Sequence, residues 1–215
     1  MKKIFNKLDS KPLLLSVFLI AYQSVLFLIV KVFQNNYHLL SSPLDQKIPF
    51  VNYFILIYCF WYFLIFYLPY FFYKKDKDIF YKYITSYVLS TIISSIIFII
   101  YPTEVIRPTL DNTNIFNILT NIIYFVDTPA INCLPSMHCA ISMLFILSVY
   151  NTKKITNKFK FFILISSLLI MLSTLFVKQH VIIDLISGNF MMILIYFYVS
   201  NDERIIKKCK KILRV

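Results

Sequence analysis

Charged residues are scarce in this chain of 215 residues, because only 15% of its positions are Asp, Glu, Lys or Arg. Soluble domains typically carry about 25% charged residues. Hydrophobic residues make up 59%, the mean hydropathy is +0.73, and the apolar residues come in long runs. These features exclude an ordinary soluble domain and predict an all-α polytopic membrane protein.

Other patterns are missing as well. No Cys-x2-Cys spacing connects the four cysteines, so the spacing does not support the alternative of a zinc ion bound by Cys133, His138, Cys139 and His180. No repeat of aromatic and basic residues suggests a nucleic-acid surface, although the net charge is +12. No separate soluble segment interrupts the chain, so we expect residues 1–215 to form one membrane-embedded domain with no metal or cofactor and no nucleic-acid partner.

Six apolar segments have the length and setting of transmembrane helices. They cover residues 12–33, 50–73, 79–101, 135–150, 161–177 and 181–200. A shorter segment, 115–126, has apolar residues at helical spacing with asparagines on the other side, which predicts an amphipathic helix in the membrane interface. This helix could pack on the bundle or cover a lipid headgroup site. Residues 201–215 are expected to form a basic tail.

Lys and Arg are distributed unevenly over the connections between these segments. Eighteen lie in the two termini and the second and fourth connections, counting Lys82 just after the second connection, whereas the other three connections hold only Lys47, Arg107 and Lys178. Short cytoplasmic connections are enriched in Lys and Arg. The pattern therefore predicts a multi-pass protein of the cell membrane with both termini in the cytoplasm.

The stretch 134–140 joins a polar loop to an apolar run. Proline suits the first position of a helix, so Pro135 predicts a helix start there. The N–H groups of Ser136, Met137 and His138 would then point at one spot, which favours an anion. His138 adds a group that can give or take a proton. An interfacial histidine without chemistry is the plain alternative.

A second polar pair lies further along, where Asp184 follows His180 by four residues and would share its helix face if the sixth helix starts near there. A carboxylate this close to a membrane span needs a partner. It can hold one imidazole nitrogen as N–H and leave the other as a lone pair for a substrate. Gly188, the only glycine, is expected to permit close helix packing below this pair.

Taken together, these residues resemble the type 2 phosphatidic acid phosphatase superfamily of membrane lipid phosphatases and lipid phosphotransferases. Its motifs are Lys-x6-Arg-Pro, Pro-Ser-x-His and Ser-Arg-x5-His-x3-Asp. Their counterparts here are Arg107-Pro108, Pro135-Ser136-Met137-His138, and Ser173-Thr174 followed by His180 and Asp184. Two cations of the family are absent, because Ile100 and Thr174 stand in their places, and Lys178 could replace one of them.

The resemblance implies a core bundle of six transmembrane helices with its site on the extracytoplasmic side. It implies that His180 attacks phosphorus, that Asp184 orients His180, and that His138 protonates the leaving alcohol. Arg107, together with Lys178 and Ser136, would bind the substrate phosphate. The expected activity is hydrolysis of a lipid phosphate or pyrophosphate monoester through a phosphohistidine.

Two alternatives remain open at this point. One is a lipid headgroup phosphotransferase of the inositol-phosphoceramide or sphingomyelin synthase type, whose motifs are also reduced. The other is a non-catalytic transporter or scaffold with this fold. In each case the partners expected are the bilayer and a membrane lipid, and the sequence does not give the oligomeric state.

Overall fold

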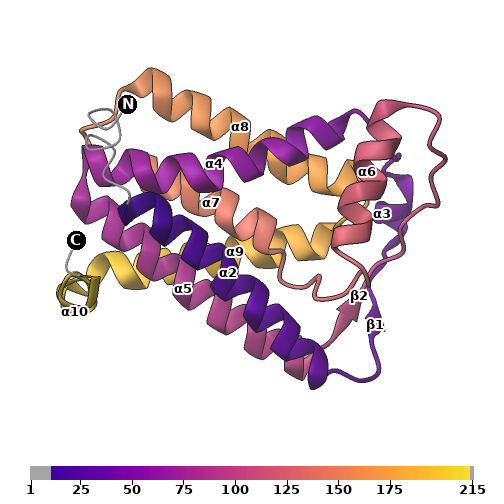
Figure 1. The fold of residues 1–215 in the computed structure, drawn as a ribbon, viewed down its shortest axis with the longest axis horizontal. Coiled ribbons are helices and arrows are strands. Elements are labelled where there is room, and N and C mark those ends of the chain that lie inside the picture. The colour runs from indigo at the N-terminus through magenta and orange to yellow at the C-terminus, as the bar shows by residue number, and fades with distance from the viewer. Residues whose placement is uncertain (1–10, 214–215) are drawn as a thin grey trace, which may run out of the picture.

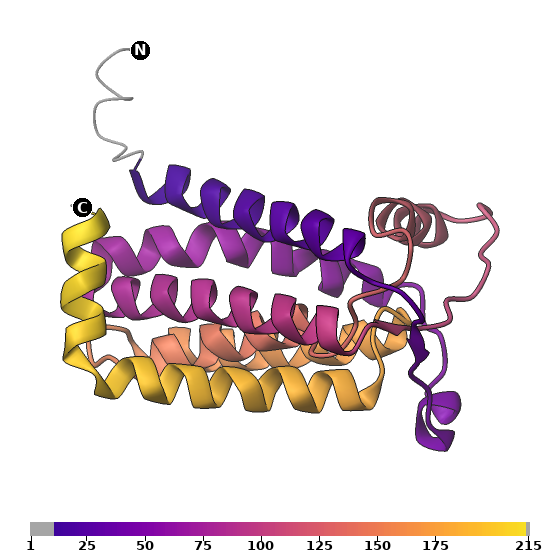
Figure 2. The same ribbon diagram turned by 90° about the horizontal axis from the view of Figure 1, so that it is seen from below.

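The computed structural model describes residues 11–213 and consists mainly of a bundle of six helices. These are α2 (Lys11–Val32), α4 (Phe54–Lys75), α5 (Lys77–Ile100), α7 (Met137–Tyr150), α8 (Asn157–Phe176) and α9 (Ile182–Asn201). They run side by side along the long axis of the molecule (Figures 1 and 2). Their order matches the six predicted segments, and the all-α prediction is confirmed. Residues 1–10, most of the predicted basic N-terminal tail, lie outside the described residues.

Five of these helices are long and apolar enough to cross a membrane, namely those other than α7. Many large apolar side chains on their outer faces are exposed, such as Phe63, Phe190 and Phe197. A large exposed apolar surface is unfavourable in water and is expected in contact with lipid tails. The chain is therefore a membrane protein.

Helix α7 is shorter than the other five, with 14 residues that extend about 21 Å at 1.5 Å per residue. It packs mainly against α8 and α9, and its side chains Cys139, Ala140, Ile141 and Leu144 are buried. Since about 30 Å of hydrocarbon must be crossed, α7 is an internal helix of the bundle rather than a lipid-exposed span of full length.

One end of the bundle carries the short elements and long loops (Figure 1). Strands β1 (His38–Leu39) and β2 (Thr103–Glu104) pair in parallel and join the loop after α2 to the loop after α5. Helix α3 (Pro43–Lys47) follows β1. The predicted amphipathic helix is present as α6 (Ile115–Val126), which Asn114 caps and which packs on α4. We call this the loop end.

The opposite end carries a helix that the sequence analysis missed. Residues expected to form a basic tail instead form α10 (Glu203–Leu213), which lies across the end of the bundle against α5 and α9 (Figure 2). Its apolar side includes Ile206, which is buried, and Cys209, which is half-buried. The helical spacing of Ile205, Ile206 and Cys209 was present in the sequence. It was overlooked because the lysine run was interpreted only as a topology signal.

Candidate active site

The two histidines singled out from the sequence lie together at the loop end. His138 is in the first turn of α7, and His180 is in the turn between α8 and α9. Their ring centroids are 5.7 Å apart. Both line a small cavity of about 40 Å³, together with Arg107 and Gln179. The structure thus brings the three predicted motifs to one place.

The carboxylate of Asp184 contacts the imidazole ring of His180. Its Oδ2 atom lies 3.1 Å from Nδ1 of His180 and also accepts the backbone N–H of Val181 at 3.1 Å. The carboxylate is fully buried, and the side chain of His180 is only 9% exposed. An ionised carboxylate can only accept, so Nδ1 carries the proton in this pair. Nε2 of His180 is therefore left with the lone pair.

The helix predicted to start near Pro135 begins two residues later. Ser136 is the N-cap and α7 begins at Met137. The N–H of Ser136 donates to the Asp184 carbonyl oxygen at 3.1 Å, and its hydroxyl accepts the N–H of Cys139 at 3.3 Å. The Ser136 side chain is fully buried. The N–H of Ser136 is thus not free for an anion, because it joins α7 to the first turn of α9.

This junction depends on Gly188, as predicted. A Cβ atom at position 188 would lie 2.4 Å from the carbonyl oxygen of Ser136 and 3.2 Å from its carbonyl carbon. Both atoms belong to the backbone and cannot rotate away. The absence of a side chain at Gly188 therefore lets α9 approach the start of α7, which keeps Asp184 close to Ser136.

Arg107 reaches the same cavity from the loop after β2. Its Nη1 donates to the Asp127 carbonyl oxygen at 2.9 Å, and its Nη2 donates to the Asp127 carboxylate and to Oε1 of Gln179. The guanidinium carbon lies 4.9 Å from the ring centroid of Tyr124. Its side chain is only 10% exposed. Arg107 is thus held in place beside the histidines by residues of the α6 region and of the His180 turn.

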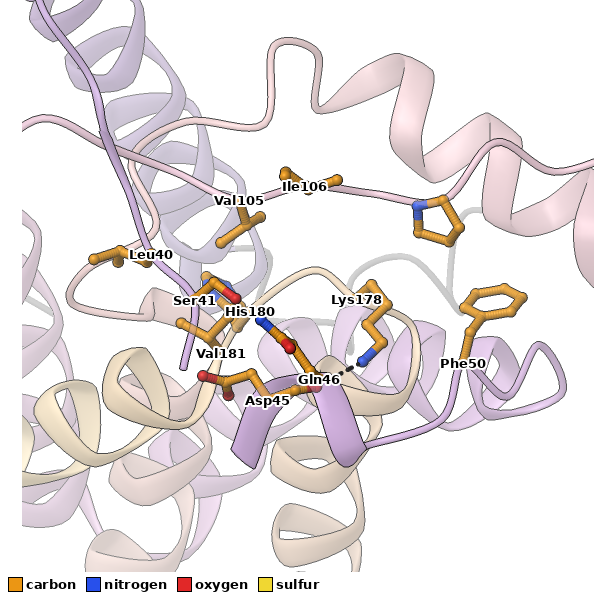
Figure 3. A pocket seen from close by; sticks show the side chains of 11 residues that line it. Leu40, Ser41, Asp45, Gln46, Phe50, Val105, Ile106, Lys178, His180 and Val181 are labelled. Atoms are coloured by element: carbon orange, nitrogen blue, oxygen red, sulfur yellow. Dashed lines mark hydrogen bonds between the residues drawn. The ribbon is translucent and has the colours of Figure 1, made fainter. Parts of the chain in front are cut away.

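The side chain of Lys178 points toward α3 (Figure 3). Its Nζ atom donates to the Asp45 carbonyl oxygen at 3.1 Å and to that of Ile48, and Asp45 in turn accepts the N–H of Ile182 through its carboxylate at 2.8 Å. Partial burial lowers the pKa of the Lys178 ammonium. The two carbonyls thus clamp the His180 turn to α3, and Lys178 does not line the cavity shared by both histidines.

Instead, Lys178 and His180 line a second cavity, of about 400 Å³ (Figure 3). Its walls come from α3, from the stretch around Val105 and Ile106, and from the turn that carries His180. Ser41 and Gln46 are among its polar residues. His180 therefore separates a small cavity beside His138 from a larger one beside α3.

A groove leads to His138 between α2, α4 and the end of α6. Its volume is about 350 Å³, and its lining is mainly aliphatic and aromatic. The residues that it shares with the small cavity include Phe27, Asp127 and His138, and Lys31 lies on its wall. A lipid chain in such a groove would have its headgroup near the two histidines.

Sequence reasoning missed the aromatic partners of His138. The hydroxyl of Tyr58 lies 2.8 Å from Nε2 of His138, and the Trp61 ring centroid is 4.5 Å from that of the imidazole. Tyr58 lies within the long apolar run of α4, in a chain with 16 tyrosines. Nothing in its local sequence distinguishes it, so only the packing of α4 on α7 reveals this contact.

Gln179 and Asp127 were also missed. Gln179 could have been noticed, because it immediately precedes His180. Asp127 is 20 residues from Arg107, and no spacing rule predicts that pair.

Thr174, which stands in place of a family arginine, is buried, and its hydroxyl donates to the Met171 carbonyl oxygen at 2.7 Å. Within residues 11–213, no group of three or more His, Cys, Asp or Glu side chains could hold a metal ion.

Comparison with known proteins adds one match. The family model described as the PAP2 superfamily matches residues 33–198, which include every motif residue discussed above. No curated protein and no solved structure matches the chain.

Proposed function

The chain belongs to the PAP2 superfamily, a family of phosphatases and related phosphotransferases, and from this premise we propose that it hydrolyses a phosphate or pyrophosphate monoester of a membrane lipid. The observation that carries the proposal is the arrangement of His180, oriented by a buried carboxylate, opposite His138 in one cavity. A nucleophile, its orienting group and a second proton-transfer group in one cavity are what such a reaction requires.

In the first step Nε2 of His180 attacks phosphorus, and the N–P bond forms as the P–O bond to the lipid breaks. Asp184 stabilises the positive charge that develops on the imidazole through the bond to Nδ1. His138 donates a proton to the departing oxygen. Since Tyr58 occupies Nε2 of His138, Nδ1 is the nitrogen that would face this oxygen.

In the second step water attacks the phosphohistidine. His138 takes a proton from this water as the P–N bond breaks, and phosphate leaves. Arg107 balances the negative charge on the phosphate oxygens in both steps, which is the main requirement for phosphoryl transfer. We leave Lys178 and Ser136 out of the phosphate site, because backbone partners occupy the Lys178 ammonium and the Ser136 N–H.

The substrate reaches the site from the bilayer. We propose that its hydrocarbon chain lies in the groove between α2, α4 and α6. The uneven distribution of Lys and Arg supports a cell-membrane protein with cytoplasmic termini and with the loop end, including the site, on the extracytoplasmic side.

The test uses purified protein in detergent micelles with a panel of phosphatidate-like lipids and polyprenyl pyrophosphate. We expect the wild type to release phosphate and His180→Ala to lose at least about a thousandfold of the rate, because the nucleophile is removed. Acid-labile ³²P on the wild type, absent from the variant, would identify the phosphohistidine. Equal rates for both proteins would refute this mechanism.

The larger cavity beside α3 favours a second candidate function. A site that admits only water needs far less than the 400 Å³ on this side of His180. An acceptor alcohol there would make the enzyme a headgroup phosphotransferase. Turnover that requires an added polyol or ceramide acceptor would support transfer, and turnover in water alone would support hydrolysis. Full biological function of His138→Ala and His180→Ala would instead indicate a non-catalytic role.

A further inference from the structure

Two buried hydrogen-bond donors in the small cavity have no partner among the described residues. They are Nε2 of Gln179 and Nε of Arg107. Gln179 is only 2% exposed, and both side chains line the cavity with His138 and His180. A buried donor left without a partner costs free energy, so its persistence calls for an explanation such as a ligand. Two such donors beside a nucleophile suit the oxygen atoms of an anion.

The direction of the Gln179 amide follows from its neighbour. Nη2 of Arg107 bonds one end of this amide. A guanidinium can only donate, so the end that faces it must be the oxygen, Oε1. The free end is therefore Nε2, a donor. The Gln179 side chain thus accepts a hydrogen bond from Arg107, and the two N–H groups of its Nε2 remain available to donate to a further partner.

Backbone geometry separates Gln179 from Lys178. Lys178 has a positive φ of 53°, and the next N–H, that of Gln179, donates to the Thr174 carbonyl oxygen at 2.9 Å. This left-handed residue is uncommon for a non-glycine and turns the chain sharply. As a result Lys178 faces the carbonyls of α3, whereas Gln179 lies in the cavity of the two histidines.

We propose that Gln179 binds the substrate phosphate, with its Nε2 donating to a non-bridging oxygen of the phosphorus that His180 attacks. This assignment rests on the proposed function. Ile100 and Thr174 stand in place of two cations of the family. The proposal assigns phosphate binding to a neutral donor, Gln179, rather than to Lys178. Arg107 then provides the positive charge, and Gln179 both holds Arg107 and completes the set of donors.

A purely structural role for Gln179 makes a different prediction, which Gln179→Glu separates. The variant keeps the shape of the side chain and an acceptor for Arg107, but it loses the donor and adds negative charge. If Gln179 only anchors Arg107, the added charge should weaken phosphate binding no more than does Asn132→Asp, which adds the same charge to the same cavity. If Nε2 contacts phosphate, binding should weaken at least about tenfold more than in Asn132→Asp, as for a lost charge-assisted hydrogen bond.

The experiment measures binding of inorganic phosphate to the purified protein in micelles by calorimetry. Asn132→Asp, the same amide-to-acid change on another residue of the small cavity, is the matched control, because its side chain keeps an acceptor for Gln34. Binding by Gln179→Glu within twofold of Asn132→Asp, or no phosphate binding by the wild type, would overturn the proposal. If Gln179→Glu does not fold, Gln179→Met replaces it: binding at least about tenfold weaker than that of the wild type is expected, and binding within twofold of the wild type would refute the proposal.

The pH dependence gives a second readout, again compared with Asn132→Asp. Protonation removes the added charge in both variants but restores a donor to the phosphate only at position 179, so the ratio of the phosphate affinity of Gln179→Glu to that of Asn132→Asp should rise as the pH falls. A flat ratio would count against the contact. Because phosphate binding needs no turnover, a protein that binds phosphate through Gln179 but cleaves no lipid phosphate would refute the proposed function and leave only the phosphate contact of Gln179 standing.

Discussion

Substitution of Gly188 by alanine tests the contact that joins the two catalytic segments. The added methyl group would lie 2.4 Å from the Ser136 carbonyl oxygen, whereas ordinary contacts with carbon begin at about 3.4 Å. The backbones must therefore separate by about 1 Å. Ser136 precedes His138 by two residues, and Gly188 follows Asp184 by four, so this displacement acts directly on the geometry of the two histidines.

Two effects on stability oppose each other in this variant. Alanine is favoured over glycine inside a helix by up to about 1 kcal/mol. Overpacking a close contact typically costs about 1–3 kcal/mol. We expect the second effect to prevail, so that Gly188→Ala lowers the free energy of unfolding by up to about 2 kcal/mol. Activity should fall more sharply, by about a hundredfold, because misplacing reacting groups by about 1 Å can cost that much.

The assays are thermal unfolding in detergent and phosphate release under identical conditions. Ile186→Ala is the control, since this α9 side chain is 54% exposed on the outer face of the helix. It should leave the rate unchanged. A Gly188→Ala protein that melts at a higher temperature than the wild type and keeps its activity would show that the helix gain prevails and that the contact does not position the site.

Two further predictions concern carboxylates. Asp184→Asn should lower kcat at least about a hundredfold with little change in KM, because the amide cannot stabilise the imidazolium of His180; a rate within threefold of the wild type would contradict this. Although partial burial raises the pKa of Asp45, hydrogen bonds from Ser42 and the Ile182 N–H outweigh it, so the pKa lies below its ordinary value of 3.8. The resulting stability is present above that value and lost as the pH falls through the lower folded pKa. The melting temperature should therefore fall at acid pH, and it should fall less in Asp45→Asn than in the wild type. Parallel profiles of melting temperature against pH would rule out this linkage.

Composition and short spacings predicted much of this protein. Long apolar runs with few charges allow little besides membrane helices, because a backbone in lipid must satisfy its own hydrogen bonds. The contact of His180 with Asp184 could be predicted because a spacing of four residues is local, although His180 lies in the turn just before α9 and not on the helix itself. The close packing at Gly188 was also predicted, since the lack of a side chain matters most where helices approach.

Tertiary packing decided the rest of the site. No local rule places Tyr58 against His138, or Asp127 against Arg107, because these residues meet only when separate segments fold together. The exact start of α7 likewise depends on the bond between Ser136 and α9. One residue of left-handed backbone sends Lys178 to α3 and Gln179 to the histidines. A charged residue near a motif is readily taken for a phosphate ligand, but the fold determines which side chain reaches the cavity.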